Sequence, residues 1–183
     1  MSERPVRTAP SALVRYAAFH RDRRNIQTHL LGVPLGVLAF AVFLRGPHDA
    51  FLAGPVTPAW ALFGLICSWY LTRGHLRLGL AASASMGLLV YAAHQLPTTG
   101  LAPWLSWTLG LLLFGVLLQA VGHYYEGRRP ASWDSAVHLL VGPMFITAYL
   151  LAAIGFLRSF AADLERRAGP IHVRDLAHPQ PQR

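Results

Sequence analysis

Apolar residues gather in five blocks along the chain, and polar, proline-rich or arginine-rich stretches separate these blocks. The blocks cover roughly residues 29–44, 58–72, 76–96, 104–122 and 135–157. The chain has too little polar surface to cover a water-exposed sphere, so we expect the blocks to lie in a bilayer. Several blocks are shorter than the ~20 residues of an ordinary span, so we expect tilt, a thin bilayer or partial immersion for some of them. The pattern predicts an all-α fold, a polytopic membrane helical bundle with four to five apolar segments.

A different pattern precedes the first block. Residues 11–28, SALVRYAAFHRDRRNIQT, mix apolar side chains with arginines. This mixture predicts an N-terminal amphipathic interfacial helix, or two short ones. Asp22 is a candidate N-cap for a helix that begins at Arg23. A helix that begins there leaves His20 on a separate arm.

The composition favours a membrane protein. Of the 183 residues, 54% are hydrophobic and only 13% are charged, and the mean hydropathy is +0.38. A soluble domain is usually about a quarter charged. The net charge of +8 is carried by arginine in short clusters between apolar blocks, which is typical of loops that face anionic lipid and argues against a nucleic-acid-binding surface. The single cysteine, Cys67, excludes an internal disulfide and a cysteine-rich metal site.

The arginine clusters also predict the orientation of the chain. They fall in the N-terminal leader and in the second and fourth connections, whereas the first connection holds only Arg45 and the third holds no charge. The positive-inside rule then places the leader and those two connections in the cytoplasm, and we expect a bacterial inner membrane. Five complete crossings would put the arginine-containing tail on the opposite side, so the number of crossings stays open. We divide the chain into a disordered N-terminus, a single membrane-embedded helical domain and a charged C-terminal tail that ends in a mobile HPQPQR, at residues 1–10, 11–157 and 158–183.

Several histidines are predicted to lie at one depth although they are far apart in the sequence. Those that fall near the cytoplasmic ends of the apolar blocks are His20, His29, His75, His123 and His138. Two of them open similar hexapeptides, HLLGVP from His29 and HLLVGP from His138, in which Pro34 and Pro143 each free a backbone carbonyl one turn earlier. Imidazoles that converge from packed helices are what a metal site in a helical bundle requires.

The spacing of two polar residues extends this candidate site. Asn25 and His29 are four residues apart and share a helical face, as do His123 and Glu126, which are three apart. Glu126 is a candidate metal ligand, an acceptor that orients an imidazole, or an ion-pair partner of a neighbouring arginine. A set of imidazoles with an occasional carboxylate suits iron, copper or zinc. A haem held by two of the histidines is a competing interpretation.

Two stretches of the sequence resemble motifs of the Mpo1-like family. The first motif is carried by Tyr16, His20, Asn25, His29, Gly32 and Pro34. The second is GHYYEGRRPA, from Gly122 to Ala131, followed by VGP at 141–143. The likeness covers about residues 11–157. It implies an Fe(II)-dependent dioxygenase that shortens 2-hydroxy fatty acids by one carbon, an α-oxidation that uses O₂.

The resemblance also implies roles for individual residues. We expect His20, His29, His123 and His138 to bind Fe²⁺, and we expect Asn25 and Glu126 to join the first three histidines as catalytic-site residues. Arg24 and Arg128 are candidates to pair with the substrate carboxylate because of their position alone. The expected partners are the lipid bilayer, a 2-hydroxy fatty acid and O₂, with no nucleic acid.

Two other classes of protein stay open at this point. One is a b-type haem electron carrier, which a strong Soret band would reveal. The other is a non-catalytic membrane transporter or scaffold, which would purify anaerobically without a transition metal.

Overall fold

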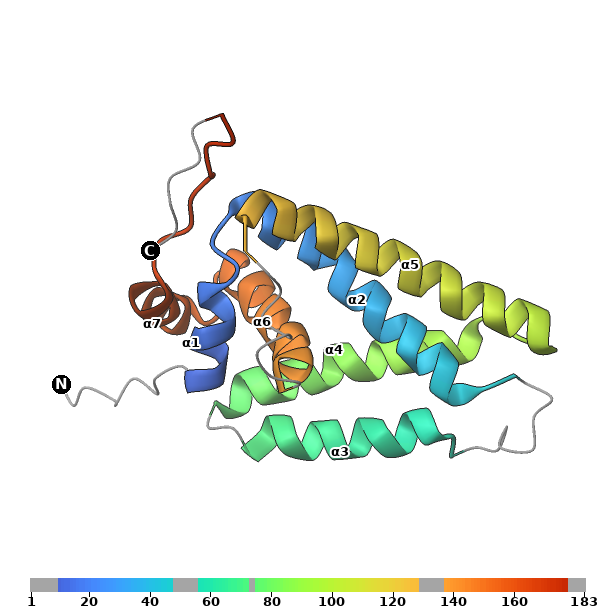
Figure 1. Ribbon diagram of the computed structural model, residues 1–183. Helices are drawn as coiled ribbons and strands as arrows, with labels where there is room; N and C mark the ends of the chain where they lie inside the picture. Colours follow the sequence, from blue (N-terminus) through green and yellow to red (C-terminus); the bar gives the residue numbers. More distant parts are fainter. Residues whose placement is uncertain (1–9, 48–55, 73–74, 129–136, 178–183) are drawn as a thin grey trace. The chain divides into compact units, whose positions relative to one another are not determined.

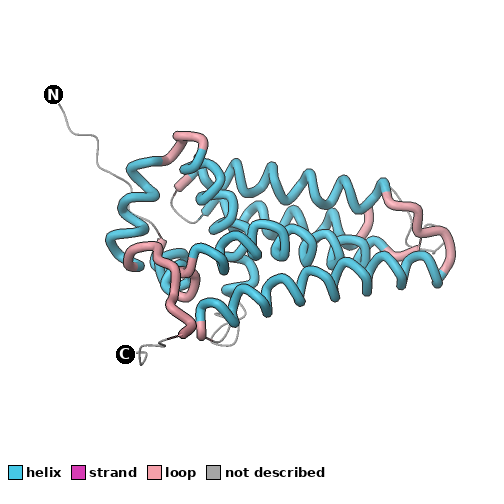
Figure 2. Tube along the Cα trace, turned by 90° about the horizontal axis from the view of Figure 1, so that it is seen from above, coloured by secondary structure: helices cyan, strands magenta, loops and turns pink. Residues whose placement is uncertain are grey.

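The structure, a computed structural model, describes residues 10–47, 56–72, 75–128 and 137–177. These residues form α-helices and loops without a β-strand (Figure 1, Figure 2). In the described ranges the helices are α1 (Ser11–Ala18), α2 (Arg23–Arg45), α3 (Pro58–Thr72), α4 (Leu76–Gln95), α5 (Leu101–Glu126), α6 (Val137–Ala153) and α7 (Arg158–Ala168). The prediction of an all-α fold is confirmed.

Three of the described helices, α2, α4 and α5, are long and apolar enough to cross a membrane. This number is lower than the four to five segments that the sequence predicts. The apolar helices α3 and α6 contain 15 and 17 residues. At ~1.5 Å per residue, such helices extend for about 22 to 26 Å and are shorter than a hydrocarbon core of about 30 Å.

The arginine-rich leader forms α1 and the first turn of α2, with a short non-helical connection between them. The Asp22 carboxylate accepts a hydrogen bond from the backbone N–H of Arg24 at 2.8 Å, and Ile26 donates to the Asp22 carbonyl at 3.1 Å. Asp22 therefore caps a helix that begins at Arg23, as its side chain predicts. His20 lies on the connection, which we call the His20 arm and define as residues 19–22.

The chain divides into two compact units. The first unit comprises residues 1–30 and 119–183, and the second comprises residues 31–118. In the first unit, α1 packs against α6 and α7 (Figure 1). All four histidines that the sequence predicts as ligands belong to this unit.

The second unit contains the pair formed by α3 and α4. Gly79 permits their close approach, because a Cβ atom there would lie 2.6 Å from the Tyr70 carbonyl oxygen. Two other histidines have structural roles in this unit. His75 caps α4 by accepting from the Leu78 N–H at 3.3 Å, and His94 lies 3.0 Å from the Thr57 hydroxyl.

The segment predicted as a charged tail begins with a helix. The apolar side chains of Phe160 and Leu164 on α7 are buried, and α7 packs against α1. Beyond α7, residues 169–174 run beside the His20 arm, and Asp22 and His172 form an isolated β-bridge. The terminal HPQPQR and residues 1–9 lie outside the described residues.

Candidate metal centre

Three imidazoles meet in the first unit, each from a different part of the chain. His20 comes from the arm, His29 from the start of α2 and His123 from the end of α5. One ring nitrogen of each lies within 4.8 Å of those of the other two. The ring centroids are 4.6 Å apart for His20 and His29, 4.9 Å for His29 and His123, and 5.2 Å for His20 and His123. Three of the four predicted ligands therefore form one cluster, which we call the histidine triad.

The hydrogen bonds of the triad leave ring nitrogens available. Nδ1 of His20 lies 2.9 Å from the Tyr16 carbonyl oxygen, and Nδ1 of His29 lies 2.9 Å from the Asn25 carbonyl oxygen. A carbonyl only accepts, so both Nδ1 atoms carry the proton and both Nε2 atoms carry a lone pair. Nε2 of His20 and Nδ1 of His123 are buried and have no hydrogen-bond partner among the described residues. Buried nitrogens of this kind are suited to bind a metal ion.

The distances within the triad are close to those of a metal site. A metal–nitrogen bond of about 2.1 Å allows two ligand nitrogens to be at most ~4.2 Å apart. The observed 4.8 Å limit requires only a small inward movement of the rings. Three neutral nitrogen ligands fit a first-row transition metal and leave coordination positions for other molecules.

Burial keeps His20 in the neutral form that a metal ligand needs. Its side chain is 1% exposed, and the Tyr16 ring stacks on it with centroids 4.2 Å apart. Burial lowers the pKa of His20 well below its usual value, and the neighbouring His29 lowers it further. Burial also raises the pKa of Tyr16, so its phenol stays protonated. Tyr16 and His20 both belong to the first motif that resembles the Mpo1-like family. The sequence did not predict that their rings stack.

Glu126 holds the His20 arm and is not part of the triad. Its carboxylate accepts hydrogen bonds from the backbone N–H of Arg21 at 3.0 Å and of Asp22 at 2.8 Å. The Asn25 side-chain amide donates to the same carboxylate at 2.9 Å and to the Phe19 carbonyl at 3.3 Å. Of the roles considered for Glu126, the structure favours the acceptor, which here binds the backbone next to His20.

Asn25 links the arm to His29. Its backbone carbonyl accepts from the His29 ring, and its side-chain amide donates to Glu126. The Asn25 side-chain oxygen is buried without a hydrogen-bond partner in the described part of the chain. Asn25 therefore lies beside the triad, and its role in catalysis stays a prediction.

Gly122 allows α5 to approach α2 at the triad. A Cβ atom at this position would overlap the Thr28 hydroxyl and the Asn25 side-chain oxygen, and it would lie 3.0 Å from Nδ1 of His29. The glycine that precedes His123 in the GHYYEG motif therefore has a steric function. The motif contained the signal, but the sequence alone did not show what a larger residue would contact.

His138 lies near the triad without belonging to it. Its side chain is 3% exposed, and its ring meets the Tyr16 ring edge-on with centroids 6.1 Å apart. The triad is the group that the structure brings within metal-binding distance, and His138 is outside it. The role of His138 as a fourth ligand stays a prediction. The idea that the hexapeptides HLLGVP and HLLVGP place two equivalent ligands also stays a prediction.

The arginine candidates are bonded within the protein. Arg24 forms an ion pair with Asp22 at 2.8 Å, and its guanidinium lies 4.4 Å from the centre of the Tyr125 ring. Arg128 donates to the Ala18 carbonyl at 3.4 Å. Arg21, which the sequence analysis did not single out, donates to the carbonyls of Ala17 and Gly169, both at 2.7 Å.

A C-terminal segment holds the other side of the arm. The His172 N–H donates to the Arg21 carbonyl and the Arg23 N–H donates to the His172 carbonyl, both at 2.9 Å. The Arg174 N–H donates to the Asp22 carboxylate at 2.8 Å. No pattern in the sequence indicated this pairing.

Comparison with known proteins identifies one family. The sequence profile described as 2-hydroxy-palmitic acid dioxygenase Mpo1-like matches residues 6–154. The match contains the whole triad and ends before α7. No curated protein and no solved structure matches the chain.

Proposed function

The chain belongs to the Mpo1-like family, and from that premise we propose that it is a membrane-bound, Fe²⁺-dependent dioxygenase that converts 2-hydroxy fatty acids into fatty acids one carbon shorter. The histidine triad is the observation that carries this proposal. Its nitrogens lie within 4.8 Å of one another. The proposed localisation is a bacterial inner membrane, with the triad near the cytoplasmic face.

His20, His29 and His123 would hold the metal. When bound there, ferrous iron supplies the capacity to bind and activate O₂. The protein keeps His20 neutral through burial, and it orients His20 and His29 through the carbonyls of Tyr16 and Asn25. His138 is proposed as an additional ligand on the basis of the sequence alone.

The proposed reaction is balanced with O₂ as the oxidant. The bond between C1 and C2 of the 2-hydroxy acid breaks, and C2 becomes the carboxyl carbon of the shortened acid. The former carboxyl carbon leaves as CO₂, O₂ is reduced, and one water forms. The residues of the site orient the ligands and limit the access of water, because His20, Asn25 and His29 are each at most 1% exposed.

The geometry of the triad argues against the haem alternative. Two axial histidines must face each other across a porphyrin. The triad rings have centroids 4.6 to 5.2 Å apart and meet edge to face. Rings in such direct contact leave no room for a porphyrin plane between them, so the geometry supports a single non-haem ion.

Oxygen consumption tests the proposal. We expect the purified protein to consume O₂ when 2-hydroxypalmitate and Fe²⁺ are both added, and to release pentadecanoate. His29→Ala should reduce turnover to the level seen without iron, whereas His94→Ala should retain turnover because His94 lies in the second unit and bonds Thr57. A wild-type protein that binds Fe²⁺ but leaves 2-hydroxypalmitate unchanged would contradict the proposal.

A further inference from the structure

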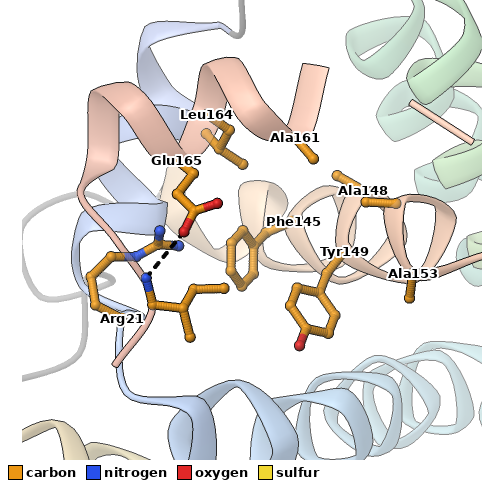
Figure 3. Close-up of a pocket in the computed structure, with 10 residues that line it drawn as sticks. Arg21, Phe145, Ala148, Tyr149, Ala153, Ala161, Leu164 and Glu165 are labelled. Atoms are coloured by element: carbon orange, nitrogen blue, oxygen red, sulfur yellow. Dashed lines mark hydrogen bonds between the residues drawn. The ribbon is translucent and has the colours of Figure 1, made fainter. Parts of the chain in front are cut away.

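A cavity of about 240 Å³ lies in the first unit, between α6, α7 and the His20 arm (Figure 3). Its walls are mainly apolar, and alanines contribute much of them: Ala148, Ala152 and Ala153 from α6, and Ala161 from α7. The small alanine side chains leave space that larger residues would fill. No pattern in the sequence indicates this cavity.

Both buried and exposed residues line the cavity. Phe145, Ala148 and Leu164 are at most 7% exposed. Ala153 and Ile171 are exposed. The cavity therefore extends from exposed residues to buried ones.

The cavity adjoins the triad at Phe145. The Phe145 ring lines the cavity and lies 5.6 Å from the His20 ring and 5.3 Å from the Tyr16 ring, centroid to centroid. Arg21, which follows His20 in the chain, lines the cavity beside Glu165 (Figure 3). The guanidinium of Arg21 already donates to protein carbonyls and lies beside this carboxylate. Arg21 is therefore already engaged within the protein and is not free to attract the acid group of a ligand into the cavity.

These features identify the chemical class of the ligand. An apolar cavity of about 150 Å³ accommodates a benzene ring, so 240 Å³ has room for a chain of about ten carbons. Small-molecule sites are mostly apolar, with few polar groups that fix orientation. A saturated alkyl chain matches these mainly apolar walls, whereas a polar ligand would lose hydrogen bonds to water there.

We infer that this cavity binds the alkyl chain of the 2-hydroxy acid whose polar end reacts at the triad; the inference rests on the proposed function. The Phe145 ring lies between the cavity and the triad. Its side chain must therefore rotate before the alkyl chain of the substrate can extend from the triad into the cavity. About ten carbons lie inside, and longer alkyl chains extend outward past exposed lining residues such as Ala153. Elongation of the substrate should therefore lower KM until the cavity is full, and further carbons should have little effect.

A pair of neighbouring alanines provides a matched test. Ala161 lines the cavity, whereas Ala162 is exposed and is not a lining residue. Ala161→Trp should raise KM for 2-hydroxypalmitate at least tenfold with a smaller change in kcat, and Ala162→Trp should leave KM unchanged. Binding of Co²⁺, followed by its visible absorption, should be the same in both variants and in the wild type. Equal KM values for the two variants, with intact Co²⁺ spectra, would overturn the inference.

Photolabelling locates the alkyl chain of the substrate independently of turnover. We expect a 2-hydroxy fatty acid with a diazirine in mid-chain to label residues of α6 and α7 in the wild-type protein, and labelling should decrease in Ala161→Trp. Turnover together with labelling only in residues 31–118 would overturn the inference and leave the proposed function intact. Labelling of α6 and α7 without turnover would support the cavity and count against the proposed reaction.

Discussion

At the residue scale, the site depends on which polar atoms lack partners. Buried polar atoms are nearly always hydrogen-bonded, and each exception requires an explanation. Three such exceptions among the described residues of the first unit are Nε2 of His20, Nδ1 of His123 and the side-chain oxygen of Asn25. The two imidazole nitrogens belong to the triad, and a bound cation would satisfy both. The unpaired ring nitrogens and the short distances between them thus both support a metal site at the triad.

Gly122 provides a steric test of the triad. Gly122→Ala would place a methyl group against Asn25, Thr28 and His29, so α5 must move away and take His123 with it. We expect Co²⁺ affinity to fall by at least tenfold, as measured by titration of the visible absorption. Gly110→Ala is the matched control. Gly110 lies on the same helix, α5, and a Cβ atom at this position would have no neighbour within 4 Å. Equal affinity in the two variants would show that His123 does not depend on this contact.

Glu126 provides a test of the hydrogen bonds behind His20. Glu126→Gln keeps the shape of the side chain but replaces one acceptor oxygen with a donor amide, which cannot accept from Arg21, Asp22 and Asn25 together. Loss of such an outer interaction typically reduces metal affinity 10- to 100-fold. We expect Co²⁺ affinity to fall by about this factor while the protein stays folded by circular dichroism. Complete loss of the Co²⁺ absorption bands would instead favour Glu126 as a direct ligand.

Asp22 links the arm to the pH dependence of stability. Burial raises the pKa of Asp22, but hydrogen bonds from Arg24 and from the backbone of Arg174 and Arg24 outweigh this effect and hold the pKa at about 2. An unfolded aspartate has a pKa of about 3.9. The charge therefore stabilises the fold above about pH 4, by about 2 to 3 kcal/mol, and this stabilisation is lost as the pH falls toward 2.

The corresponding measurement compares melting temperatures of metal-free protein. We expect Asp22→Asn to melt lower than the wild type at pH 6, and we expect the difference to shrink as the pH approaches 3. Protonation of the histidines lowers the melting temperature of both proteins alike, so it does not affect the difference between them. A difference that stays constant down to pH 3 would contradict the depressed pKa of Asp22.

Local rules explain how much of the site the sequence could predict. The Asp22 cap and the convergence of His20 with His29 follow from capping preferences and from the break that the cap imposes. The stacking of Tyr16 on His20 and the need for glycine at position 122 depend on contacts between distant segments. Such contacts cannot be derived from spacing within one helix.

At the element scale, the structure adds a second restraint on the His20 arm. Glu126 binds one side of the arm, and residues 169–174 bind the other through Arg21, Asp22 and Arg23. This segment lies outside the residues that the family profile matches. The arm has only four residues between two helices, so these hydrogen bonds replace the regular helical bonds that it lacks.

Truncation tests this restraint. A chain that ends at Ala168 loses the acceptor and donor groups of residues 169–174, so the His20 arm should become mobile. We expect faster hydrogen exchange at residues 19–22 and a Co²⁺ affinity reduced by about tenfold, as for other outer-shell losses. A chain that lacks only residues 178–183 is the control and should behave as the wild type. Unchanged hydrogen exchange at residues 19–22 in the chain that ends at Ala168 would show that Glu126 alone is sufficient to hold the His20 arm.

The C-terminal segment shows why elements were harder to predict than the apolar blocks. The apolar residues of α7, such as Phe160 and Leu164, are four apart, but the surrounding arginines and acids favoured a solvated tail. The pairing of His172 with the arm joins residues about 150 positions apart through backbone groups. Backbone pairing leaves no mark on side-chain patterns, so the sequence could not indicate it.

At the scale of the whole molecule, the triad restricts how the chain crosses the membrane. His29 lies at the beginning of α2 and His123 at the end of α5, and the two rings are in contact. In a protein that spans a bilayer, both ends would therefore lie on the same side, which requires an even number of crossings between them. Crossing by α2, α4 and α5 alone would give an odd number and would separate the two histidines.

A crossing by α3 would resolve this conflict. Its 15 residues extend for about 22 Å, so the bilayer must thin locally or polar groups at the helix ends must reach the interface. Four crossings from α2 to α5 would result, in agreement with the arginine clusters, which predict that the second and fourth connections lie in the cytoplasm.

Labelling of single cysteines tests the crossing by α3. In a Cys67→Ser background, Val56→Cys and Thr72→Cys place one thiol before α3 and one at its end, and both positions are exposed. We expect an impermeant maleimide to label Val56→Cys in intact cells and Thr72→Cys only after lysis. If both thiols react from the same side, α3 does not cross. One of the three long helices would then also have to stay on one side, because His29 and His123 can meet only after an even number of crossings.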